Sequence, residues 1–235
     1  MSTDAAVVCL SGGQDSTTCL HHALGRYGRV HAVTFDYGQR HRVELECAAA
    51  IAAAARVPQV VLPLDVFTRL GDGSLTNPDI ESRLDATGTG NAYAELRGLP
   101  SSFVPGRNIV FLGLAAAFGV PRGYETLVAG VCATDDAGYP DCRADFVESL
   151  EGTIRIGMDC PGFAIDAPLL HRTKAQTWAL ADELGVLELV RTQTHTCYEG
   201  VRGELHDWGH GCGACPACET RARGWAEFEA VAGRR

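Results

Sequence analysis

The stretch AAVVCLSGGQDSTTCLHHAL, residues 5–24, decides the fold of this chain. An apolar run over residues 5–10 breaks at SGG, residues 11–13, and apolar residues resume from Ser16 with helical spacing. This pattern predicts a strand, a tight turn and a helix. Two glycines permit close backbone approach to a ligand, and free amide groups gather at the positive end of the helix. The sequence therefore predicts an anion-binding turn, although a bare Gly-Gly turn also occurs without a ligand.

The same alternation of strand and helix patterns continues along the chain. Apolar runs recur at 5–10, 30–36, 58–64 and 125–131, and helical patterns lie between them at 16–27, 42–56 and 108–120. This alternation is typical of an α/β fold with an open, mostly parallel sheet and helices on both faces. A further helix is expected at 173–184, ended by Gly185, and the turn-rich residues 65–103 predict an excursion or lid near the strand ends.

Composition limits the functional classes. The 235 residues are 46% hydrophobic and 21% charged, which indicates a globular chain with one main core. No apolar segment approaches the ~20 residues of a membrane span, and the N-terminus lacks a signal-peptide pattern, so a cytoplasmic protein is expected. The net charge of −9 disfavours nucleic acid as a partner and favours small-molecule substrates.

The turn at residues 11–16, SGGQDS, lacks the lysine of a Walker A sequence. Nothing in it therefore aims a point charge at the bond between the β and γ phosphates. We expect cleavage between the α and β phosphates instead, with AMP transferred and pyrophosphate held by the turn. Asp15 either bridges magnesium to the phosphates or caps the first helical turn.

Ten cysteines in a chain without a secretory signal favour metal binding or catalysis over disulfides. Cys212, Cys215 and Cys218 form C-x-x-C-x-x-C, and Cys197 lies upstream. Four thiolates at this spacing suit a closed, structural zinc site that staples the C-terminal segment. An iron–sulfur cluster is the competing interpretation. His206 and His210 fall inside the connection and are not assigned as ligands. We expect a catalytic domain over residues 1–190 and a zinc-binding helical extension over 191–235.

Several longer motifs resemble one family. They are SGGQDS (11–16), TFDYGQRHRVE (34–44), FVPGRNIVFL (103–112), GVCATDDAGYPDCR (130–143), IDAPLLHRTKAQTWALAD (165–182) and CGACPAC (212–218). Together they resemble the QueC family of 7-cyano-7-deazaguanine synthases, within the PP-loop ATP pyrophosphatase superfamily, from the first strand to the final helix. The family usually has Phe-Ser near the point where this chain has Asp136-Ala137.

The resemblance implies an ATP-dependent ligase. It would convert 7-carboxy-7-deazaguanine and ammonia to the 7-cyano compound through an amide, releasing AMP and pyrophosphate, with ATP and magnesium as cosubstrate and zinc as structural metal. The implied catalytic residues are Asp15, Arg107 and Lys174. The implied ATP-binding residues are Leu10, Ser11, Gly12, Gly13, Gln14, Asp15, Ser16, Thr17, Thr18, Asp36, Arg40 and Gly130. A homodimer is also implied.

The position of each motif suggests the substrate contacts. The expected substrate-binding residues are Tyr37, Arg107, Asn108, Tyr139, Asp141 and Arg143. A carboxylate suits the amino group and ring NH of a purine-like edge, which favours Asp141, while Tyr139 offers stacking and an arginine offers a partner for the substrate carboxylate. Plainer alternatives are a solvated turn for Asp36, a helix cap for Asn108, a self-bonded turn for Asp141 and a surface position for Lys174.

Two other functions remain open from the sequence. A transfer-RNA thiolation enzyme of the same superfamily would share the phosphate turn but would need a basic RNA surface and catalytic cysteines. A nucleotide-sensing module would keep the fold without the chemistry. The acidic balance counts against the first, and the intact motifs count against the second.

Overall fold

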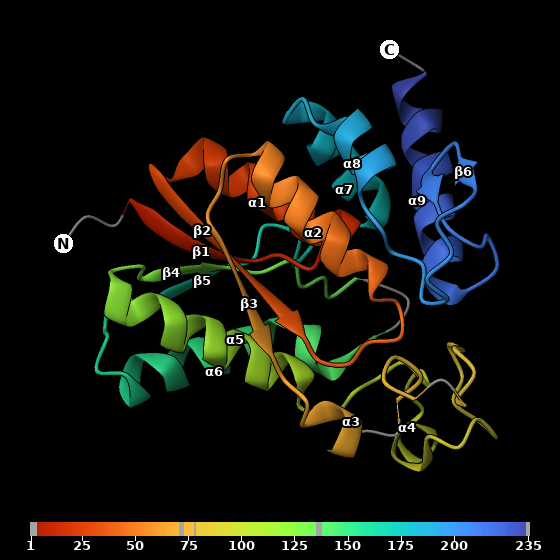
Figure 1. The fold of residues 1–235 in the computed structure, drawn as a ribbon, viewed down its shortest axis with the longest axis horizontal. Helices are drawn as coiled ribbons and strands as arrows, with labels where there is room; N and C mark the ends of the chain where they lie inside the picture. Colours follow the sequence, from red (N-terminus) through yellow and green to blue (C-terminus); the bar gives the residue numbers. More distant parts are fainter. Residues whose placement is uncertain (1–3, 71–72, 78, 135–137, 234–235) are drawn as a thin grey trace.

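The computed structural model describes residues 4–70, 73–77, 79–134 and 138–233 (Figure 1). Its main sheet has five parallel strands in the order β3-β2-β1-β4-β5. The strands are β1 (Ala5–Cys9), β2 (Arg29–Asp36), β3 (Gln59–Pro63), β4 (Thr126–Val128) and β5 (Ala164–Asp166). The predicted parallel sheet is confirmed, and β5, which the sequence patterns did not reveal, is a short addition at one edge.

Helices cover both faces of this sheet (Figure 1). The helices are α1 (Gln14–Arg26), α2 (Val43–Ala54), α3 (Phe67–Leu70), α4 (Ala92–Arg97), α5 (Arg107–Gly119), α6 (Ala144–Gly157), α7 (Lys174–Glu183), α8 (Leu187–Gln193) and α9 (Pro216–Ala232). Two 3-10 turns, Val120–Arg122 and Pro140–Cys142, complete the set. The four helices expected at 16–27, 42–56, 108–120 and 173–184 are confirmed as α1, α2, α5 and α7, with ends shifted by one or two residues.

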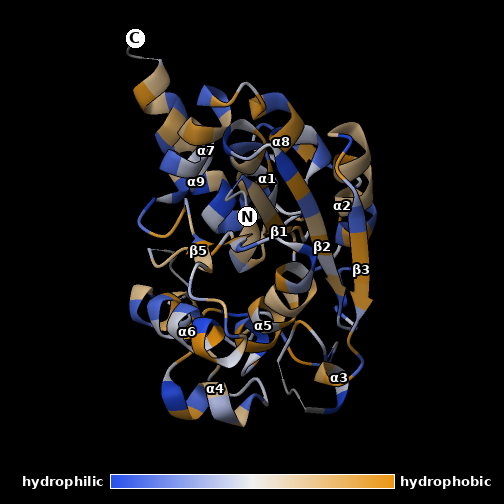
Figure 2. Cartoon of the chain, turned by 90° about the vertical axis from the view of Figure 1, so that its left-hand side faces the viewer, coloured by the Kyte–Doolittle hydropathy of each residue, from blue (hydrophilic) through white to orange (hydrophobic). Residues whose placement is uncertain are grey.

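Alternation along the central strands sends side chains into two cores. Val7 of β1 packs in one core with residues of α5 and α6, whereas Val8 packs in the other with residues of α1 and α2. Because successive side chains of a strand point to opposite faces, a buried central strand needs apolar residues at every position. Helix α6 carries both hydrophobic and hydrophilic residues along its length (Figure 2), and its Val147 and Ile154 are buried.

Strand order determines where a ligand can enter. The chain leaves β1 for β2 on one side, and β4 pairs with β1 on the other side. In open α/β sheets, ligands bind outside the carboxyl ends of the strands where the order reverses. This rule places a ligand beside the turn after β1 and the segment after β4.

The excursion between β3 and α5 contains α3 and α4 and lies near the carboxyl end of β3 (Figure 1). It is tied to the rest of the chain by the Arg40 amide, which donates to the Leu75 carbonyl at 2.9 Å. Its internal bonds include Asn91, which caps α4 and donates to the Ser101 carbonyl. The predicted excursion is therefore packed against the strand ends.

The C-terminal segment packs on the sheet domain through α7. Trp178 of α7 and Trp225 of α9 meet edge to face at 4.9 Å. A two-stranded antiparallel ribbon, β6 (Leu205–His206) and β7 (Gly209–His210), precedes α9. Residue 190 lies within α8, and the domain division at 190/191 stays a prediction. None of the helices in the described ranges is both long and apolar enough to cross a membrane.

Candidate active site

The two glycines of the turn after β1 have different surroundings. Gly12 has φ of +91°, and a Cβ there would lie 2.2 Å from the Glu44 carbonyl oxygen. Its freedom therefore serves close packing against α2, and the expected approach of a ligand to Gly12 stays a prediction. Gly13 instead borders a cavity and leads directly into α1.

Two serines hold the turn in shape. The hydroxyl groups of Ser11 and Ser16 lie 3.0 Å apart, and the Ser16 hydroxyl also donates to the Gly13 carbonyl at 3.2 Å. The first amides of α1 have no carbonyl partner within the helix and carry its positive end. The turn is therefore a preorganised site for an anion such as a phosphate group.

The same helix end buries polar atoms that no protein group satisfies. Gln14 is 2% exposed, and neither its Nε2 nor its Oε1 has a hydrogen-bond partner among the described residues. The hydroxyl of Thr17 is unpaired in the same way. A buried polar atom without a partner costs about 1–3 kcal/mol, so these atoms favour a polar ligand.

A cavity of about 290 Å³, here called the main cavity, opens where the turn meets the ends of β1, β2 and β4. Ten of the residues expected in the site line it: Ser11, Gly13, Gln14, Asp15, Ser16, Tyr37, Arg107, Asn108, Gly130 and Tyr139. They come from segments more than 120 residues apart in the sequence, from Ser11 to Tyr139. Predicted nucleotide and substrate residues therefore share one cavity.

Asp15 makes an ion pair at the edge of that cavity. The Lys174 ammonium donates to its two carboxylate oxygens at 2.9 and 3.2 Å. The Lys174 side chain is only 12% exposed, so the surface alternative is wrong. Asp15 and Lys174 also border a side cavity of about 120 Å³. Gly224 of α9 permits this approach, because a Cβ there would lie 2.6 Å from that of Lys174.

Arg107 and its neighbours form the opposite wall. The Arg107 guanidinium lies 6.0 Å from the centre of the Tyr37 ring. Burial would lower the pKa of Arg107, but attraction to Tyr37, Tyr139 and Asp141 raises it, so the guanidinium remains charged. A permanent cation on this wall suits a carboxylate or phosphate.

Asp141 caps α5 from outside the helix. Its Oδ2 accepts from the Asn108 amide at 3.3 Å, while the Asn108 side chain donates to the Asp141 carbonyl at 3.0 Å. Burial raises the pKa of Asp141, and Arg107 opposes that shift. Its Oδ1 has no partner among the described residues. One oxygen therefore holds the start of α5, and the other is buried without a partner among the described residues.

Tyr139 is fixed by the excursion. Its hydroxyl lies 2.6 Å from that of Ser102, and its ring stacks on Phe103 with 5.8 Å between centres. Burial raises the pKa of Tyr139, so the hydroxyl stays protonated near neutral pH. The excursion thus supplies part of the site's wall.

Other expected residues do not line either cavity: Leu10, Gly12, Thr17, Thr18, Asp36, Arg40, Asp141 and Arg143. Asp36 accepts two bonds from Arg42, at 2.7 and 3.0 Å, and Arg40 donates to Glu199 at 2.7 Å. Their roles toward ATP or substrate stay predictions. Asp136 and Ala137, where the family pattern differs, lie outside the described residues.

Some lining residues are not in the expected ATP-binding or substrate-binding sets. His41, Glu44, His195, Thr196 and Tyr198 all border the main cavity. The first two belong to the quoted motif TFDYGQRHRVE, and the others surround Cys197 in HTCY, so the motifs themselves are the signal for them. The His195 amide donates to the Gly12 carbonyl at 2.9 Å, which ties this segment to the phosphate turn.

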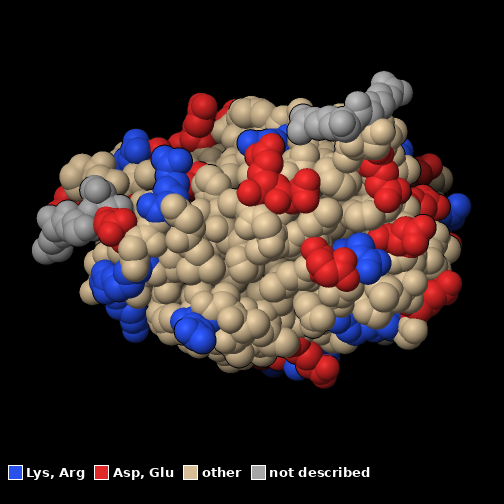
Figure 3. Space-filling model, turned by 90° about the horizontal axis from the view of Figure 1, so that it is seen from above, with Lys and Arg blue, Asp and Glu red and all other residues tan. Residues whose placement is uncertain are grey.

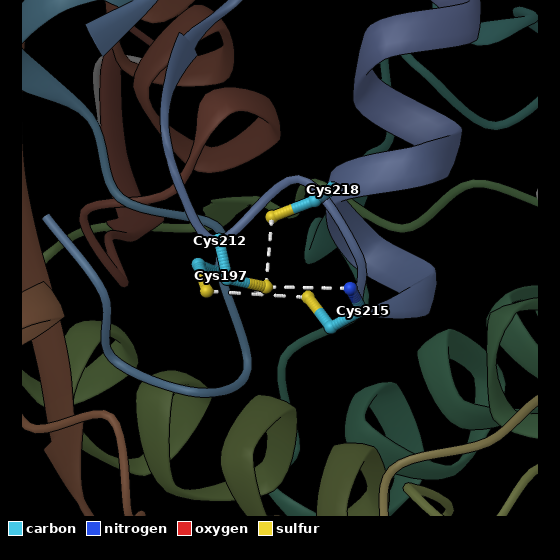
Figure 4. Close-up of side chains that lie close together, drawn as sticks. All are labelled: Cys197, Cys212, Cys215 and Cys218. Atoms are coloured by element: carbon cyan, nitrogen blue, oxygen red, sulfur yellow. Dashed lines mark hydrogen bonds between the residues drawn. The ribbon is translucent and has the colours of Figure 1, made fainter. Parts of the chain in front are cut away.

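The four expected cysteines come together at the start of α9 (Figure 4). Their sulfur atoms all lie within 4.8 Å of one another, with Cys212 and Cys218 at 3.9 Å and Cys197 and Cys215 at 4.0 Å. Four thiolates around a zinc ion at about 2.3 Å would lie about 3.8 Å apart, so the residues fit a tetrahedral metal.

Local hydrogen bonds reach the sulfur atoms of Cys212 and Cys197. The amides of Ala214 and Cys215 donate to the Cys212 sulfur at 3.5 and 3.3 Å. Hydrogen bonds from Cys215 and Cys218 lower the pKa of Cys197. His206 and His210 pair instead with the carbonyls of Gly211 and Glu204, which agrees with leaving them out of the ligand set.

Comparison with known proteins shows the family to which this chain belongs. The family model described as queuosine biosynthesis protein QueC matches residues 5–229. A protein named 7-cyano-7-deazaguanine synthase from Acidovorax sp. (strain JS42) is 47% identical over 236 residues, covering 96% of this chain and 94% of that one. One from Caulobacter sp. (strain K31) is 49% identical over 244 residues, covering 97% and 92%.

The fold has a more distant likeness among solved structures. A 4-thiouridine synthetase–RNA complex with bound ATP matches with a TM-score of 0.51 at 15% identity, covering 97% of this chain and 52% of that one. That likeness concerns the fold alone. By its family match and its near-full-length relatives, this chain belongs to the QueC family.

Proposed function

We propose that the protein is a 7-cyano-7-deazaguanine synthase, which uses ATP to convert 7-carboxy-7-deazaguanine and ammonia to the 7-cyano compound. The observation that carries this proposal is the main cavity, which joins the anion-binding turn of α1 to the permanent cation of Arg107. A nucleotide phosphate and a substrate carboxylate repel each other, so both need neutralising groups before they react. The relatives' shared name supplies the product, 7-cyano-7-deazaguanine.

The first step activates the carboxylate. An oxygen of the substrate carboxylate attacks the α phosphorus of ATP, the bond to the bridging β oxygen breaks, and pyrophosphate leaves with that electron pair. The turn at residues 11–16 would hold the departing diphosphate through its amides and hydroxyl groups. Lys174, held beside Asp15, would add a positive charge there.

Ammonia then attacks the acyl carbon, AMP leaves, and a proton is lost, which gives the amide. Activation of the amide oxygen by a second ATP makes that oxygen a leaving group. The amide nitrogen loses its two protons as the nitrile forms and AMP departs. One phosphate site serves both activations, so the reaction should release more AMP than nitrile.

We propose that the 7-deazaguanine ring lies between Tyr37 and Tyr139, with Asn108 and Asp141 at its hydrogen-bonding edge. The unpaired Oδ1 of Asp141 suits an acceptor for ring NH or amino groups. Arg143 stays a candidate for the substrate carboxylate, beside Arg107. Asp36 and Arg40 stay candidates for ATP, and each would exchange its present ion-pair partner for the nucleotide.

Metal, assembly and location complete the proposal. Zinc would fill the four-cysteine cluster, where its chemistry is structural because the cluster offers four protein ligands and no open position. Magnesium would accompany ATP. We carry a cytoplasmic homodimer from the family resemblance, and sedimentation of the purified protein would test the dimer.

The direct test is product analysis by mass spectrometry. The protein is incubated with ATP, magnesium, ammonium and 7-carboxy-7-deazaguanine. We expect the nitrile to form, with AMP and pyrophosphate in place of ADP and phosphate. ADP as the nucleotide product, or an amide that never becomes nitrile, would contradict the proposal.

We do not propose RNA thiolation. Acidic and basic side chains are interspersed on the face in Figure 3, and the described residues form no continuous basic patch on that face. Binding to transfer RNA that weakens steeply with salt would favour that alternative.

A further inference from the structure

The main cavity contains a histidine–glutamate pair that the steps above do not use. His41, in the connection from β2 to α2, is 4% exposed, and Glu44, in the first turn of α2, is 8% exposed. The Nε2 of His41 lies 3.3 Å from the Glu44 Oε2, and the Glu44 Oε1 accepts from the Gln39 side chain at 3.0 Å. Both residues line the cavity.

The second nitrogen of His41 is buried and has no partner among the described residues. Because a carboxylate only accepts, the neighbouring Nε2 carries the proton and Nδ1 carries a lone pair. A histidine whose tautomer is set by a carboxylate, with its other nitrogen unsatisfied, is arranged to accept a proton. An unpaired buried nitrogen is also costly, which favours a ligand there.

Other ionisable groups on the cavity wall are poorly suited to this role. Burial raises the pKa values of Tyr37 and Tyr139, and raises that of Cys9 to about 12, so all three hold their protons near neutral pH. Asp15 is engaged by the Lys174 ammonium.

Two groups from another segment also face the pair. His195 uses its Nε2 at the Cys197 carbonyl, 3.0 Å away, and its Nδ1 is buried without a partner among the described residues, as that of His41 is. The Tyr198 ring centre lies 6.0 Å from that of His41. Neither carries a negative charge that would compete with Glu44 for a cation. His41 differs from His195 in having a carboxylate, that of Glu44, at its protonated nitrogen, so the His41–Glu44 pair places an anion beside a proton acceptor.

The proposed reaction needs such a group. Near neutral pH most ammonia is present as ammonium, which has no lone pair and cannot attack carbon. We propose that ammonium enters beside Glu44 and that His41 Nδ1 removes one of its protons, an inference that rests on the proposed function. The N–H electron pair stays on nitrogen, the new ammonia attacks the activated carbonyl carbon, and AMP leaves with the C–O electron pair. The nitrogen then loses a further proton to solvent.

The test compares two nucleophiles with the His41→Gln variant. Glutamine keeps an amide near the Glu44 carboxylate but offers no base in place of Nδ1. Hydroxylamine is largely uncharged near neutral pH, so it needs no proton removed before it attacks. We expect amide formation from ammonium to fall about 10²-fold or more, with hydroxamate formation and ATP–pyrophosphate exchange within a few-fold of wild type. His171→Gln, an exposed histidine on neither cavity wall, should leave all three rates unchanged.

Two results would overturn the inference: unchanged amide formation from ammonium in the variant, or an equal loss of all three activities in a folded variant. Should His41→Gln unfold, Glu44→Gln replaces it. The same selective loss is expected at smaller size, because His41 Nδ1 stays in place and only the negative charge beside the histidine and the entering ammonium is lost. A wild-type protein that makes no nitrile would instead refute the proposed function, which keeps the two failures distinct.

Discussion

The phosphate turn and the cysteine cluster are both built from short polar motifs, yet they satisfy their polar groups differently. At the start of α1, the side-chain amide of Gln14 and the hydroxyl of Thr17 are buried without partners in the described part of the chain. At the start of α9, four sulfurs meet one another, and backbone amides point at Cys212. The first region suits a ligand that binds and leaves in each turnover, whereas the second suits an ion that stays bound.

The two regions are joined by one short segment. Cys197 belongs to the cluster, while His195, Thr196 and Tyr198 on either side of it line the main cavity. The Arg221 side chain of α9, which is 1% exposed, adds a bond from its NH1 to the Thr196 hydroxyl at 2.8 Å. A metal ion bound by the four cysteines would therefore also hold the 195–198 segment, which forms one wall of the main cavity.

Removing one metal ligand from the cysteine cluster should have the largest effect on stability and activity. Cys218→Ser removes one ligand, so we expect loss of the metal, a fall in melting temperature of about 10 °C or more, and loss of turnover as the 195–198 segment moves. Elemental analysis of the wild type should give zinc, without the visible absorbance of an iron–sulfur cluster. The control Cys160→Ala alters a buried cysteine outside the cluster and should keep the metal. A serine variant with full metal and an unchanged melting temperature would refute the ligand assignment.

Changing the phosphate turn should separate activity from stability. Asp15→Asn keeps an oxygen for the Lys174 ammonium but removes the charge, so AMP formation should fall about 10²-fold or more. The melting temperature should move by less than about 4 °C, because the Asp15 side chain is 26% exposed and asparagine keeps an oxygen for the Lys174 ammonium. Asp145→Asn is the matched control, since Asp145 is likewise the second residue of a helix but is exposed. Normal turnover of Asp15→Asn would mean that the carboxylate has no part in the reaction.

The local sequence pattern was enough to predict some of these features but not others. The strand, turn and helix over residues 5–26 and the set of four cysteines follow from spacing within short segments, and the structure confirms both. The role of Gly12 did not follow, because its requirement comes from α2, more than thirty residues away.

Contacts between residues far apart in the sequence could not be predicted from local pattern either. The strand β5 has only three residues, too few to show a period, and Asp141 caps a helix that begins 34 residues earlier, at Arg107. His41 and Tyr198 meet at the main cavity although 157 residues separate them, so only the folded chain reveals that they share a wall.

The smallest expected effect concerns the end of β2. Asp36 follows the rule that nucleotide contacts gather at the carboxyl edge of a parallel sheet, but its carboxylate is bound to Arg42 in this structure. The Arg42 side chain is 61% exposed, so breaking the pair should cost no more than about 1 kcal/mol of folding free energy. If Asp36 leaves Arg42 to bind ATP, Asp36→Asn should raise the KM for ATP about three- to ten-fold and leave the KM for the carboxylate substrate unchanged.

Arg42→Gln breaks the same ion pair while keeping the Asp36 carboxylate, so it distinguishes the two roles. A carboxylate that binds the nucleotide is released by this change, and the KM for ATP should stay the same or fall. Equal increases in both variants would show that the ion pair itself shapes the turn after β2. Asp36 would then resemble the cysteine cluster, whose groups pair with one another, and not the phosphate turn, whose buried polar groups need a ligand as partner.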